Sequence, residues 1–298
     1  MQKRNNIIIG DLIIDQNYLM KPSGKSAEFN SKKYNLTNKN FNLGGAGMVY
    51  TALKKLDANV DFFTISSQKF KNIFSQLKLK NISFSDSFTI EKKRYWEKNK
   101  LNFQLNNIRL NKNEISKFQL RFLKEIDKIK KYSNIILCDY RYGIFSNEFT
   151  KTIIKIFKKK KCEIYVDQQS TSVDPDIIKY KNIDYLILNK KEYDKIFIIY
   201  KIKKKNLLTK LAKLQKIFNI KCLVIKTGSK GCSIFKDNNI TSVKPSKKTN
   251  LYLDTIGAGD YFLASFVYKR YVNIAQRMKL SNNYAFSKII GKSKVNKY

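Results

Sequence analysis

A glycine-containing turn that ends in a carboxylate lies in the stretch DTIGAGDYFLASF. An apolar segment compatible with a helix begins directly after Asp260, so Gly257, Ala258, Gly259 and Asp260 are expected in the first turn of that helix. The free N–H groups and the dipole of a helix start bind anions. A carboxylate beside such an anion site is the group that phosphoryl transfer needs to accept a hydroxyl proton. Asp260 is therefore a candidate base, unless it only caps the helix.

A second glycine-rich turn, FNLGGAGMVYTALKKL, places Gly44, Gly45 and Gly47 before an amphipathic helix. Bare backbone at a helix start suits the close approach of a hydroxylated or anionic ligand. A turn of this kind is weak evidence by itself.

The stretch LILNKKEYDKIF places Asn189 and Glu192 directly after a buried strand, on one side of a helical turn. Ligands collect at this end of parallel strands, which makes the pair a candidate site. The alternative is an ordinary helix N-cap with an acidic first turn. Further along, CLVIKTGSKGCSIF joins two strands through Thr227, Gly228 and Gly231, as either a hairpin or a nucleotide-facing loop.

The elements that must hold these turns alternate between short apolar runs and segments with helical spacing. The runs, each predicted as a strand, are 7–9, 60–65, 135–138, 164–166, 185–188, 222–225 and 232–235. Helical spacing is found in 49–56, 70–77, 122–129 and 207–214. The alternation predicts an α/β fold with a mostly parallel sheet that helices cover on both faces.

Two segments, about 12–41 and about 83–108, are extended and alternate polar residues, too polar for central parallel strands. They predict a small accessory sheet that closes over a site as a lid. Neither an internal repeat nor a Pro-rich linker divides the chain, so we interpret residues 1–298 as one domain.

Composition narrows the classes of function. The chain has 298 residues, 43% of them hydrophobic, which is enough for a substantial core. It has no histidine, which excludes His-dependent hydrolases and His-ligated metalloenzymes and leaves proton transfer to a carboxylate, Lys or Tyr. The four cysteines have no CxxC spacing and are expected to be buried and reduced, in a cytoplasmic protein.

The formal net charge of +37, from 60 basic and 23 acidic residues, is typical of proteins that bind nucleic acid or anionic membranes. However, Lys outnumbers Arg 53 to 7 and is scattered along the chain, whereas phosphate and base readers favour clustered Arg. We interpret the charge as solvated surface and expect no specific nucleic-acid or membrane partner. The first apolar run is interrupted at Gly10, Asp11 and Asp15, which predicts a strand and not a signal peptide.

In this order the motifs resemble the ribokinase-like carbohydrate kinases of the phosphofructokinase-B type. The opening GDLIID, the GG turn, the NxxE element, the TGxxG loop and the DTxGAGD signature carry the likeness along essentially the whole chain. Within that family the chain is similar to the kinase half of bacterial heptose-7-phosphate kinase and ADP-heptose synthase enzymes, through IIIGDLIIDQNY, TIEKKRYWEKNKLNFQL, LCDYRYGIFS and NNYAFSKIIGKSKV. The resemblance implies a three-layer α/β/α sandwich with a β-sheet lid.

The resemblance also implies roles for individual residues. Asp260 would be the base that activates a sugar hydroxyl, and the amides of Gly257, Ala258 and Gly259 would form the anion hole. The residues implied to contact the sugar or its phosphate are Asp15, Gly44, Gly45, Lys92, Arg94 and Asp139. Those implied to contact ATP are Asn189, Glu192, Thr227, Gly228, Gly231 and Asn283, with Glu192 also organising Mg²⁺ through water. A homodimer formed through the lid is implied as well.

Three departures from the family pattern touch substrate recognition. Met48 stands where the family has an Asn that bonds a substrate hydroxyl, and the bulky Tyr261 comes directly after the candidate base. Residues 167–169 are Asp-Gln-Gln where heptose kinases have Asp-Pro-Lys, so Gln168 and Gln169 leave out a cation. We therefore expect ATP-dependent phosphorylation of a sugar or sugar phosphate, first of all heptose-7-phosphate at its 1 position. Another sugar, sugar phosphate or nucleoside remains open, and the non-enzyme alternative is a degenerate kinase fold that binds nucleotide or sugar.

Overall fold

The computed structural model describes residues 5–98, 100–131, 133–169, 174–203, 206–246 and 255–295. Asp254, in the DTIGAGD motif, lies outside them. The helices are α1 (Ala46–Lys54), α2 (Lys71–Gln76), α3 (Lys112–Glu125), α4 (Asn147–Lys159), α5 (Lys190–Ile199), α6 (Leu207–Phe218), α7 (Ala258–Tyr268) and α8 (Ile274–Val295). The strands are β1 (Asn6–Gly10), β2 (Leu12–Lys25), β3 (Lys32–Gly45), β4 (Val60–Ser67), β5 (Ile82–Ser85), β6 (Thr89–Glu97), β7 (Lys100–Arg109), β8 (Asn134–Asp139), β9 (Glu163–Gln168), β10 (Tyr185–Asn189), β11 (Cys222–Lys226), β12 (Cys232–Lys236) and β13 (Asn239–Val243).

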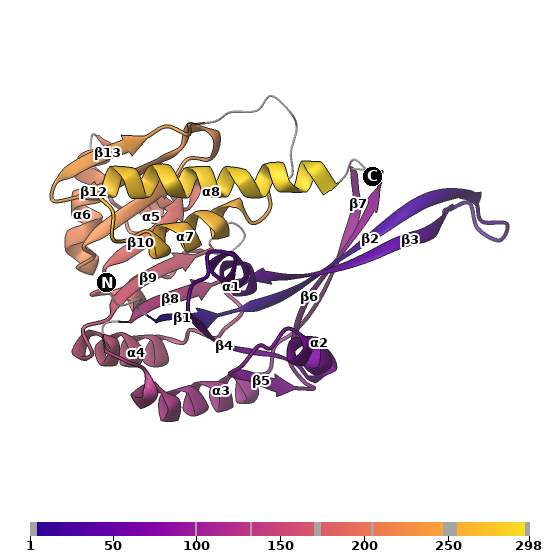
Figure 1. The fold of residues 1–298 in the computed structure, drawn as a ribbon, viewed down its shortest axis with the longest axis horizontal. Coiled ribbons are helices and arrows are strands. Elements are labelled where there is room, and N and C mark those ends of the chain that lie inside the picture. Colours follow the sequence, from indigo (N-terminus) through magenta and orange to yellow (C-terminus); the bar gives the residue numbers. More distant parts are fainter. Residues whose placement is uncertain are drawn as a thin grey trace.

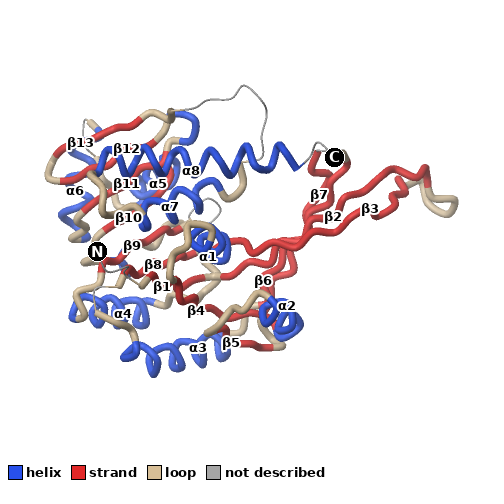
Figure 2. The backbone as a smooth tube through the Cα atoms, viewed as in Figure 1, coloured by secondary structure: helices blue, strands red, loops and turns tan. Residues whose placement is uncertain are grey.

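The central sheet has the strand order β13-β12-β11-β10-β9-β8-β1-β4-β5. The strands from β11 to β5 are parallel, and β12 and β13 are added antiparallel at one edge. Figure 1 shows helices on both faces of this sheet, and Figure 2 separates the red strands of the middle layer from the blue helices. The predicted α/β class and the three-layer sandwich are therefore confirmed. All seven predicted strand runs lie within strands.

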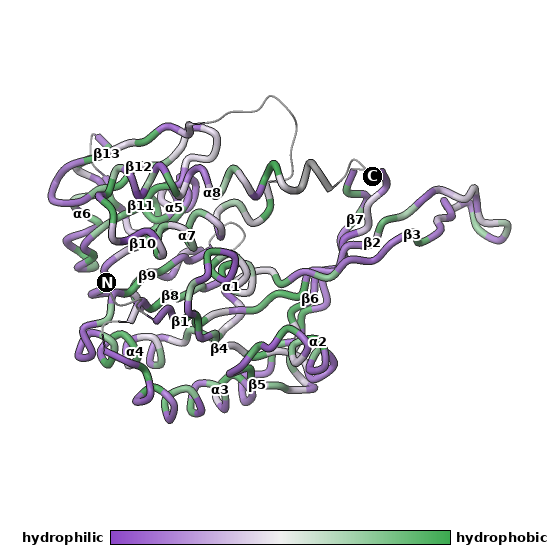
Figure 3. The backbone as a smooth tube through the Cα atoms, viewed as in Figure 1, coloured by the Kyte–Doolittle hydropathy of each residue, from purple (hydrophilic) through white to green (hydrophobic). Residues whose placement is uncertain are grey.

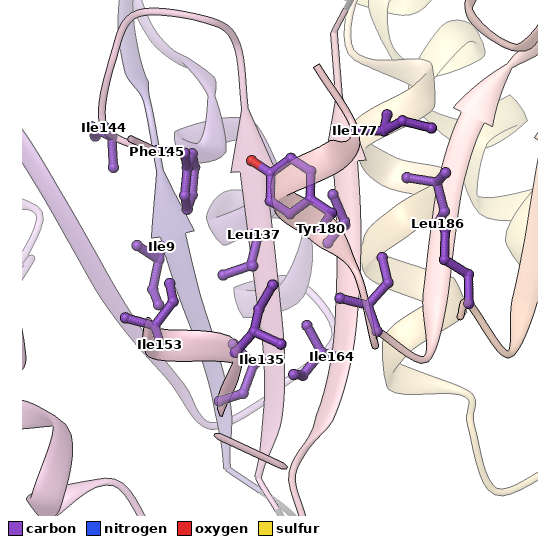
Figure 4. Packing of buried hydrophobic residues seen from close by; sticks show 14 of the residues in the cluster. Ile9, Ile135, Leu137, Ile144, Phe145, Ile153, Ile164, Ile177, Tyr180 and Leu186 are labelled. Atoms are coloured by element: carbon purple, nitrogen blue, oxygen red, sulfur yellow. The ribbon is translucent and has the colours of Figure 1, made fainter. Parts of the chain in front are cut away.

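The core consists of two layers of apolar side chains, one on each face of the sheet. Because successive strand residues point to opposite faces, Ile7 and Ile9 enter one layer while Ile8 enters the other. Helices α3, α4, α5 and α6 cover the first layer, and α1, α2, α7 and α8 cover the second. Figure 4 shows part of the first layer, with Ile9, Ile135, Leu137 and Ile164 side by side. The near-continuous apolar strands are those of a sheet buried on both faces.

The lid is a separate four-stranded sheet with the order β3-β2-β6-β7. Strands β2 and β3 leave the sandwich as a long antiparallel pair, and β2 runs parallel to β6 (Figure 1). The lid strands carry mostly hydrophilic residues in Figure 3, and all ten residues of β7 are exposed. The two predicted segments pair as expected, but the second begins later than residue 83, because β5 (Ile82–Ser85) belongs to the central sheet.

Candidate active site

The turn before α7 brings bare backbone to a helix start, where the N–H of Ala258 donates to the carbonyl oxygen of Thr255 at 3.1 Å. Gly257 is the residue before the helix and adopts a left-handed conformation with φ of 82°, which a residue with a side chain adopts only with strain. Among the described residues no side chain caps this helix start. Asp260 therefore does not serve as the helix cap, and the alternative of a purely structural carboxylate loses its main support. Met48 of α1 packs on the turn, since a Cβ added at Gly257 would stand 3.3 Å from its side chain.

Asp260 faces a hydroxyl from the central sheet. Tyr140, directly after β8, donates a hydrogen bond from its hydroxyl to Asp260 Oδ1 at 2.5 Å. The backbone N–H of Tyr140 in turn donates to Asp11 Oδ2 at 2.8 Å, which fixes the turn that carries the tyrosine. Asp260 is half-buried, so solvent reaches it while protein atoms surround most of it. The carboxylate is therefore held in one orientation at the carboxyl edge of the sheet.

The surroundings of Asp260 raise the pKa of its carboxyl group to about 7. Loss of solvating water is the main cause that raises its pKa, to about 7, and the negative charges of Asp167 and Asp15 act in the same direction. The hydrogen bond from Tyr140 and the positive charge of Lys226 lower it. A carboxylate with a pKa near the working pH is well suited to general base catalysis.

Replacing Tyr140 with Phe should shift the pH dependence of catalysis. The Tyr140 hydrogen bond stabilises the charged form of Asp260, so its loss raises the pKa of that carboxyl group and shifts the rise of kcat/KM to higher pH. We expect roughly a tenfold loss of kcat/KM at pH 7 and a smaller loss at pH 9. A pH profile of Tyr140→Phe parallel to that of the wild type would contradict this role.

The residues expected at the acceptor lie on one face of the lid root. Asp15 of β2 is in register with Lys92 of β6, so their side chains share a face. Arg94, two residues further along the same face, binds Asp15 Oδ1 through its guanidinium at 2.8 Å. Gly44 is directly beneath, because an added Cβ there would overlap with Asp15 Oδ2. The negative charge of Asp15 contributes to raising the pKa of Asp260, so the two carboxylates lie within electrostatic range of each other.

At Gly44 and Gly45 the chain passes too close to its neighbours to allow a side chain. Gly45 has a φ of 58°, and a Cβ there would stand 2.5 Å from the carbonyl oxygen of Asp11. Helix α1 begins at Ala46, so Gly47 lies in its first turn, whereas the sequence predicted it before the helix. The bare backbone at this helix start faces the root of the lid.

Asp139 does not occupy the accessible position that the resemblance implied. Its side chain is 1% exposed, and its Oδ2 accepts hydrogen bonds from Gln168 Nε2 at 3.0 Å and from the Tyr180 hydroxyl at 2.8 Å. Lys179 Nζ is 3.1 Å from the same oxygen. The tyrosine of this network is labelled in Figure 4. A carboxylate enclosed in this way orders the strand ends beneath the site, so we remove Asp139 from the proposed substrate contacts.

Gln168 belongs to the same buried network. Besides its bond to Asp139, its side chain donates to the carbonyl oxygen of Asp176 and accepts from the N–H of Asp176, both at 3.0 Å. This departure from the family pattern therefore fills a structural position below the site.

At the position expected to bind the nucleotide, Asn189 and Glu192 form a capping box. The Asn189 side chain accepts from the Glu192 N–H at 3.0 Å, and Glu192 Oε2 accepts from the Asn189 N–H at 2.8 Å. The alternative interpretation of this motif, a helix N-cap, thus describes its local geometry. Glu192 is nevertheless buried at the carboxyl end of β10, and its charge acts on Lys226 in the neighbouring strand. Glu192 can therefore both cap helix α5 and contact a bound ligand.

The Thr-Gly-Ser-Lys-Gly turn is a hairpin between β11 and β12. Thr227 donates from its hydroxyl to the carbonyl oxygen of Gly231 at 2.8 Å, and Gly228 has a φ of 59°. Gly231 has no room for a side chain, because an added Cβ would overlap with the carbonyl oxygen of Val243. The turn lies beside the start of α5, next to Asn189 through the register of β10 and β11. Asn283 is half-buried on α8, which packs against α7.

The donor groups at this edge suit a hard cation that nucleotide phosphates help to bind. Asp167 at the end of β9 and Glu192 at the start of α5 offer carboxylate oxygens, the ligands that Mg²⁺ prefers. Within the described ranges no three Cys, Asp or Glu side chains converge so as to hold a metal ion by themselves. Mg²⁺ commonly keeps several waters and is bound through one or two carboxylates plus phosphates, so the residues present fit it.

Sequence reasoning did not single out three residues of this site. Tyr140 lies within the motif LCDYRYG, and Lys226 directly precedes the TG turn, but neither type of residue signals a function from spacing alone. Asp167 stands out in the sequence only through the two glutamines after it. The roles of all three depend on side chains that meet across strands, which a single sequence does not reveal.

The fold and the site together define a carbohydrate kinase. The chain belongs to the pfkB family of carbohydrate kinases, and the match to this family spans residues 3–273. The predicted membership of the phosphofructokinase-B type family is therefore confirmed.

Among curated relatives, the chain is similar to bifunctional HldE proteins. The chain is 29% identical over 309 residues to the bifunctional protein HldE of Aliarcobacter butzleri, covering 98% of this chain and 62% of that protein. It is 28% identical to HldE of Campylobacter jejuni strain RM1221, covering 95% of this chain and 60% of that protein. The predicted similarity to the kinase half of these enzymes is confirmed, and the chain spans about three fifths of their length.

Solved structures agree in fold. Phosphofructokinase-2 from Escherichia coli in complex with fructose-6-phosphate has a TM-score of 0.73 at 13% identity, covering 97% of this chain and 94% of that chain. Ribokinase from Arabidopsis thaliana, complexed with ribose and ATP, has a TM-score of 0.69 at 15% identity, covering all of both chains. At such identities the likeness shows the fold alone. Among the described helices none is long and apolar enough to cross a membrane.

Proposed function

We propose that this protein transfers the terminal phosphoryl group of ATP to a hydroxyl of a heptose 7-phosphate or a closely similar sugar phosphate, at the 1 position. The observation that carries the proposal is Asp260, a carboxylate with a pKa of about 7 beside the uncapped start of α7. The similarity to HldE proteins along nearly the whole chain supports the heptose acceptor.

In this reaction Asp260 and the backbone amides at the start of α7 have separate roles. Asp260 takes the proton of the acceptor hydroxyl, whose oxygen forms a bond to the terminal phosphorus of ATP. The bond between that phosphorus and the oxygen bridging to the β-phosphate breaks, and ADP leaves with the electron pair. The amides of Gly257 and Gly259 stabilise the charge on the oxygens of the transferring phosphoryl group, and the amide of Ala258 joins them when it exchanges its bond to the Thr255 carbonyl oxygen for one to phosphate.

The remaining residues hold the two substrates in line. Asp15, Gly44 and Gly45 orient the sugar hydroxyls, while Lys92 and Arg94 bind its phosphate. Thr227, Gly228, Gly231 and Asn283 lie along the nucleotide. Asn189 and Glu192, with Asp167, would hold Mg²⁺ and the nucleotide phosphates at the carboxyl end of β10. When bound, the magnesium ion neutralises charge on the nucleotide phosphates.

Met48 and Tyr261 modify the acceptor side of the site. Met48 packs on Gly257, where it offers no hydrogen bond to a sugar hydroxyl. Tyr261 is buried, and its hydroxyl accepts from Lys55 Nζ at 3.1 Å while its ring packs on Tyr284 at 5.0 Å between centroids. Tyr261 therefore points into the α7 and α8 layer, and Met48 is the departure that bears on the choice of sugar.

The proposal is tested by measuring ATP turnover with a panel of sugars and sugar phosphates. We expect turnover with a heptose 7-phosphate, with a kcat/KM at least tenfold above that for fructose 6-phosphate, ribose or nucleosides. Equal or higher turnover with one of those acceptors would replace the proposed substrate. No turnover with any acceptor, together with retained nucleotide binding, would favour a degenerate kinase fold that binds nucleotide or sugar.

Lys92 should distinguish phosphorylated from free sugars. Its ammonium is partly desolvated, which lowers its pKa, and it lies on the face that carries Asp15. We expect Lys92→Met to raise the KM for the phosphorylated acceptor about tenfold and to leave the KM of the free sugar unchanged. Lys93→Met is the matched control, because Lys93 lies on the opposite face near Glu91 at 3.9 Å. Equal effects of the two variants would remove Lys92 from the phosphate contacts.

We propose further that two copies associate through the lid, in a cytoplasmic enzyme. The edge strand β7 exposes Phe103 and Leu105 on one face, and Phe103 stacks on Tyr95 with ring centroids 4.4 Å apart. Unpaired strand edges with apolar residues favour association. Sedimentation velocity should give a dimer for the wild type and a monomer for Phe103→Glu, and a monomeric wild type at high micromolar concentration would refute the lid dimer.

A further inference from the structure

Lys226 is a cation at the carboxyl edge of the sheet. It is the last residue of β11 and is in register with Asn189 of β10. Its Nζ donates to Asp167 Oδ2 at 2.7 Å, although Asp167 belongs to β9, two strands away in the sheet order. The lysine side chain therefore crosses the end of β10, over the strand from which α5 starts.

The ammonium of Lys226 also lies beside the start of α7. A Cβ added at Gly259 would stand 3.5 Å from Nζ, so this glycine leaves the lysine in contact with the first helical turn. The side chain is only 16% exposed, and the carboxylates of Asp167, Glu192 and Asp260 all act on its charge. The ammonium thus contacts Asp167, interacts electrostatically with Glu192 and Asp260, and lies next to the first turn of α7.

We propose that Lys226 binds the transferring phosphoryl group, and that Asp167 holds the lysine in position before the nucleotide arrives. This inference rests on the proposed kinase function and adds a residue to it. A lysine ammonium is a compact point charge that suits a phosphate oxygen, and a fixed cation at the developing charge favours transfer. Lys226 supplies a cation to this edge of the sheet from the end of β11.

A purely structural role makes a different prediction. A buried ion pair adds little net stability, but removing one partner leaves the other charge buried without compensation. If Lys226 only neutralises Asp167, then removing the lysine has no consequence once Asp167 is also neutral. If Lys226 contacts phosphate, removing it weakens binding in both backgrounds. The two roles are therefore separable by a double-mutant cycle.

The experiment measures kcat for ATP and the affinities for ADP and for a non-hydrolysable ATP analogue, at saturating Mg²⁺. For Lys226→Gln we expect kcat to fall about a hundredfold and analogue affinity about tenfold, with ADP affinity within threefold of wild type. Lys226→Arg should recover part of the analogue affinity, because it keeps the charge. Lys236→Gln is the control, since Lys236 is 54% exposed at the other end of the hairpin, and it should match the wild type.

The decisive comparison is made in the Asp167→Asn background, where the amide oxygen can still accept the hydrogen bond that positions Lys226 but no charge at position 167 needs a partner. There we expect Lys226→Gln to weaken analogue binding about tenfold again. An effect below twofold in that background would overturn the inference, as would equal losses for ADP and the analogue. A wild type without turnover would reject the proposed kinase function, whereas the binding measurements still decide whether Lys226 contacts a terminal phosphate.

Discussion

Replacing Asp260 with Asn should reduce kcat about a thousandfold and leave nucleotide affinity within threefold of wild type. Asparagine keeps the shape of the side chain and can still accept the hydrogen bond of the Tyr140 hydroxyl, so the orientation at the helix start is preserved. It cannot accept a proton from the sugar hydroxyl. The loss therefore measures proton transfer and not binding, and steady-state kinetics with isothermal calorimetry separates the two.

The same substitution makes a prediction about stability. The folded-state pKa of Asp260 is raised from 3.8 to about 7, so the folded protein binds a proton more tightly than the unfolded chain. Between those values, rising pH ionises the carboxyl group first in the unfolded chain, which lowers the free energy of unfolding, and the cost is complete above pH 7. Asp260→Asn removes that cost, so its Tm at pH 8 should equal or exceed that of the wild type. A clearly lower Tm would mean that the charged carboxylate supports the fold.

Replacing Glu192 with Gln should reduce kcat about a hundredfold and raise the Mg²⁺ concentration needed for half-maximal activity at least tenfold. A glutamine oxygen can still accept the N–H of Asn189, so the capping box survives while the charge is lost. Titration of Mg²⁺ at saturating ATP measures the effect. An unchanged dependence of activity on Mg²⁺ would mean that Glu192 only caps helix α5 and does not help to bind the metal.

The control for this experiment is Asn189→Ala. It removes the side chain that accepts from the Glu192 N–H, and loss of such a cap costs about 1 kcal/mol of stability. We expect the Tm of Asn189→Ala to fall, with a much smaller change in magnesium dependence than in Glu192→Gln. The pair therefore separates the capping role from the metal role, both of which the NxxE element allows.

Much of the fold was predictable because the signals are local. The strand cores at 7–9, 135–138 and 222–225 are apolar runs too short for helices, and the polar alternation of β2 and β6 set the lid apart from them. The start of the second lid segment was misplaced, because Ile82–Ser85 alternates like the strands after it. Only its pairing with β4 assigns it to the central sheet.

The site was predictable only in part. Asp260, Asn189 and Glu192 follow from turns that the chain itself signals, and they lie at one edge of the sheet as parallel strands require. Lys226 and Tyr140 could not be found in this way, since each reaches its partner from a different strand. Asp139 was misjudged because its motif fixes its position along the chain but not the buried partners that surround it.

The position of Asp15 at the root of the lid has a mechanical consequence. Ten residues of extended chain separate it from the end of β2 at Lys25, a lever of about 30 Å. If the β2 and β3 hairpin rotated about its base, its tip would move far while the residues around Asp15 would hardly move. Movement of the hairpin tip would therefore leave Asp15 and its contact with Arg94 nearly in place, so a change in hairpin length would alter access to this edge more than the geometry at the root.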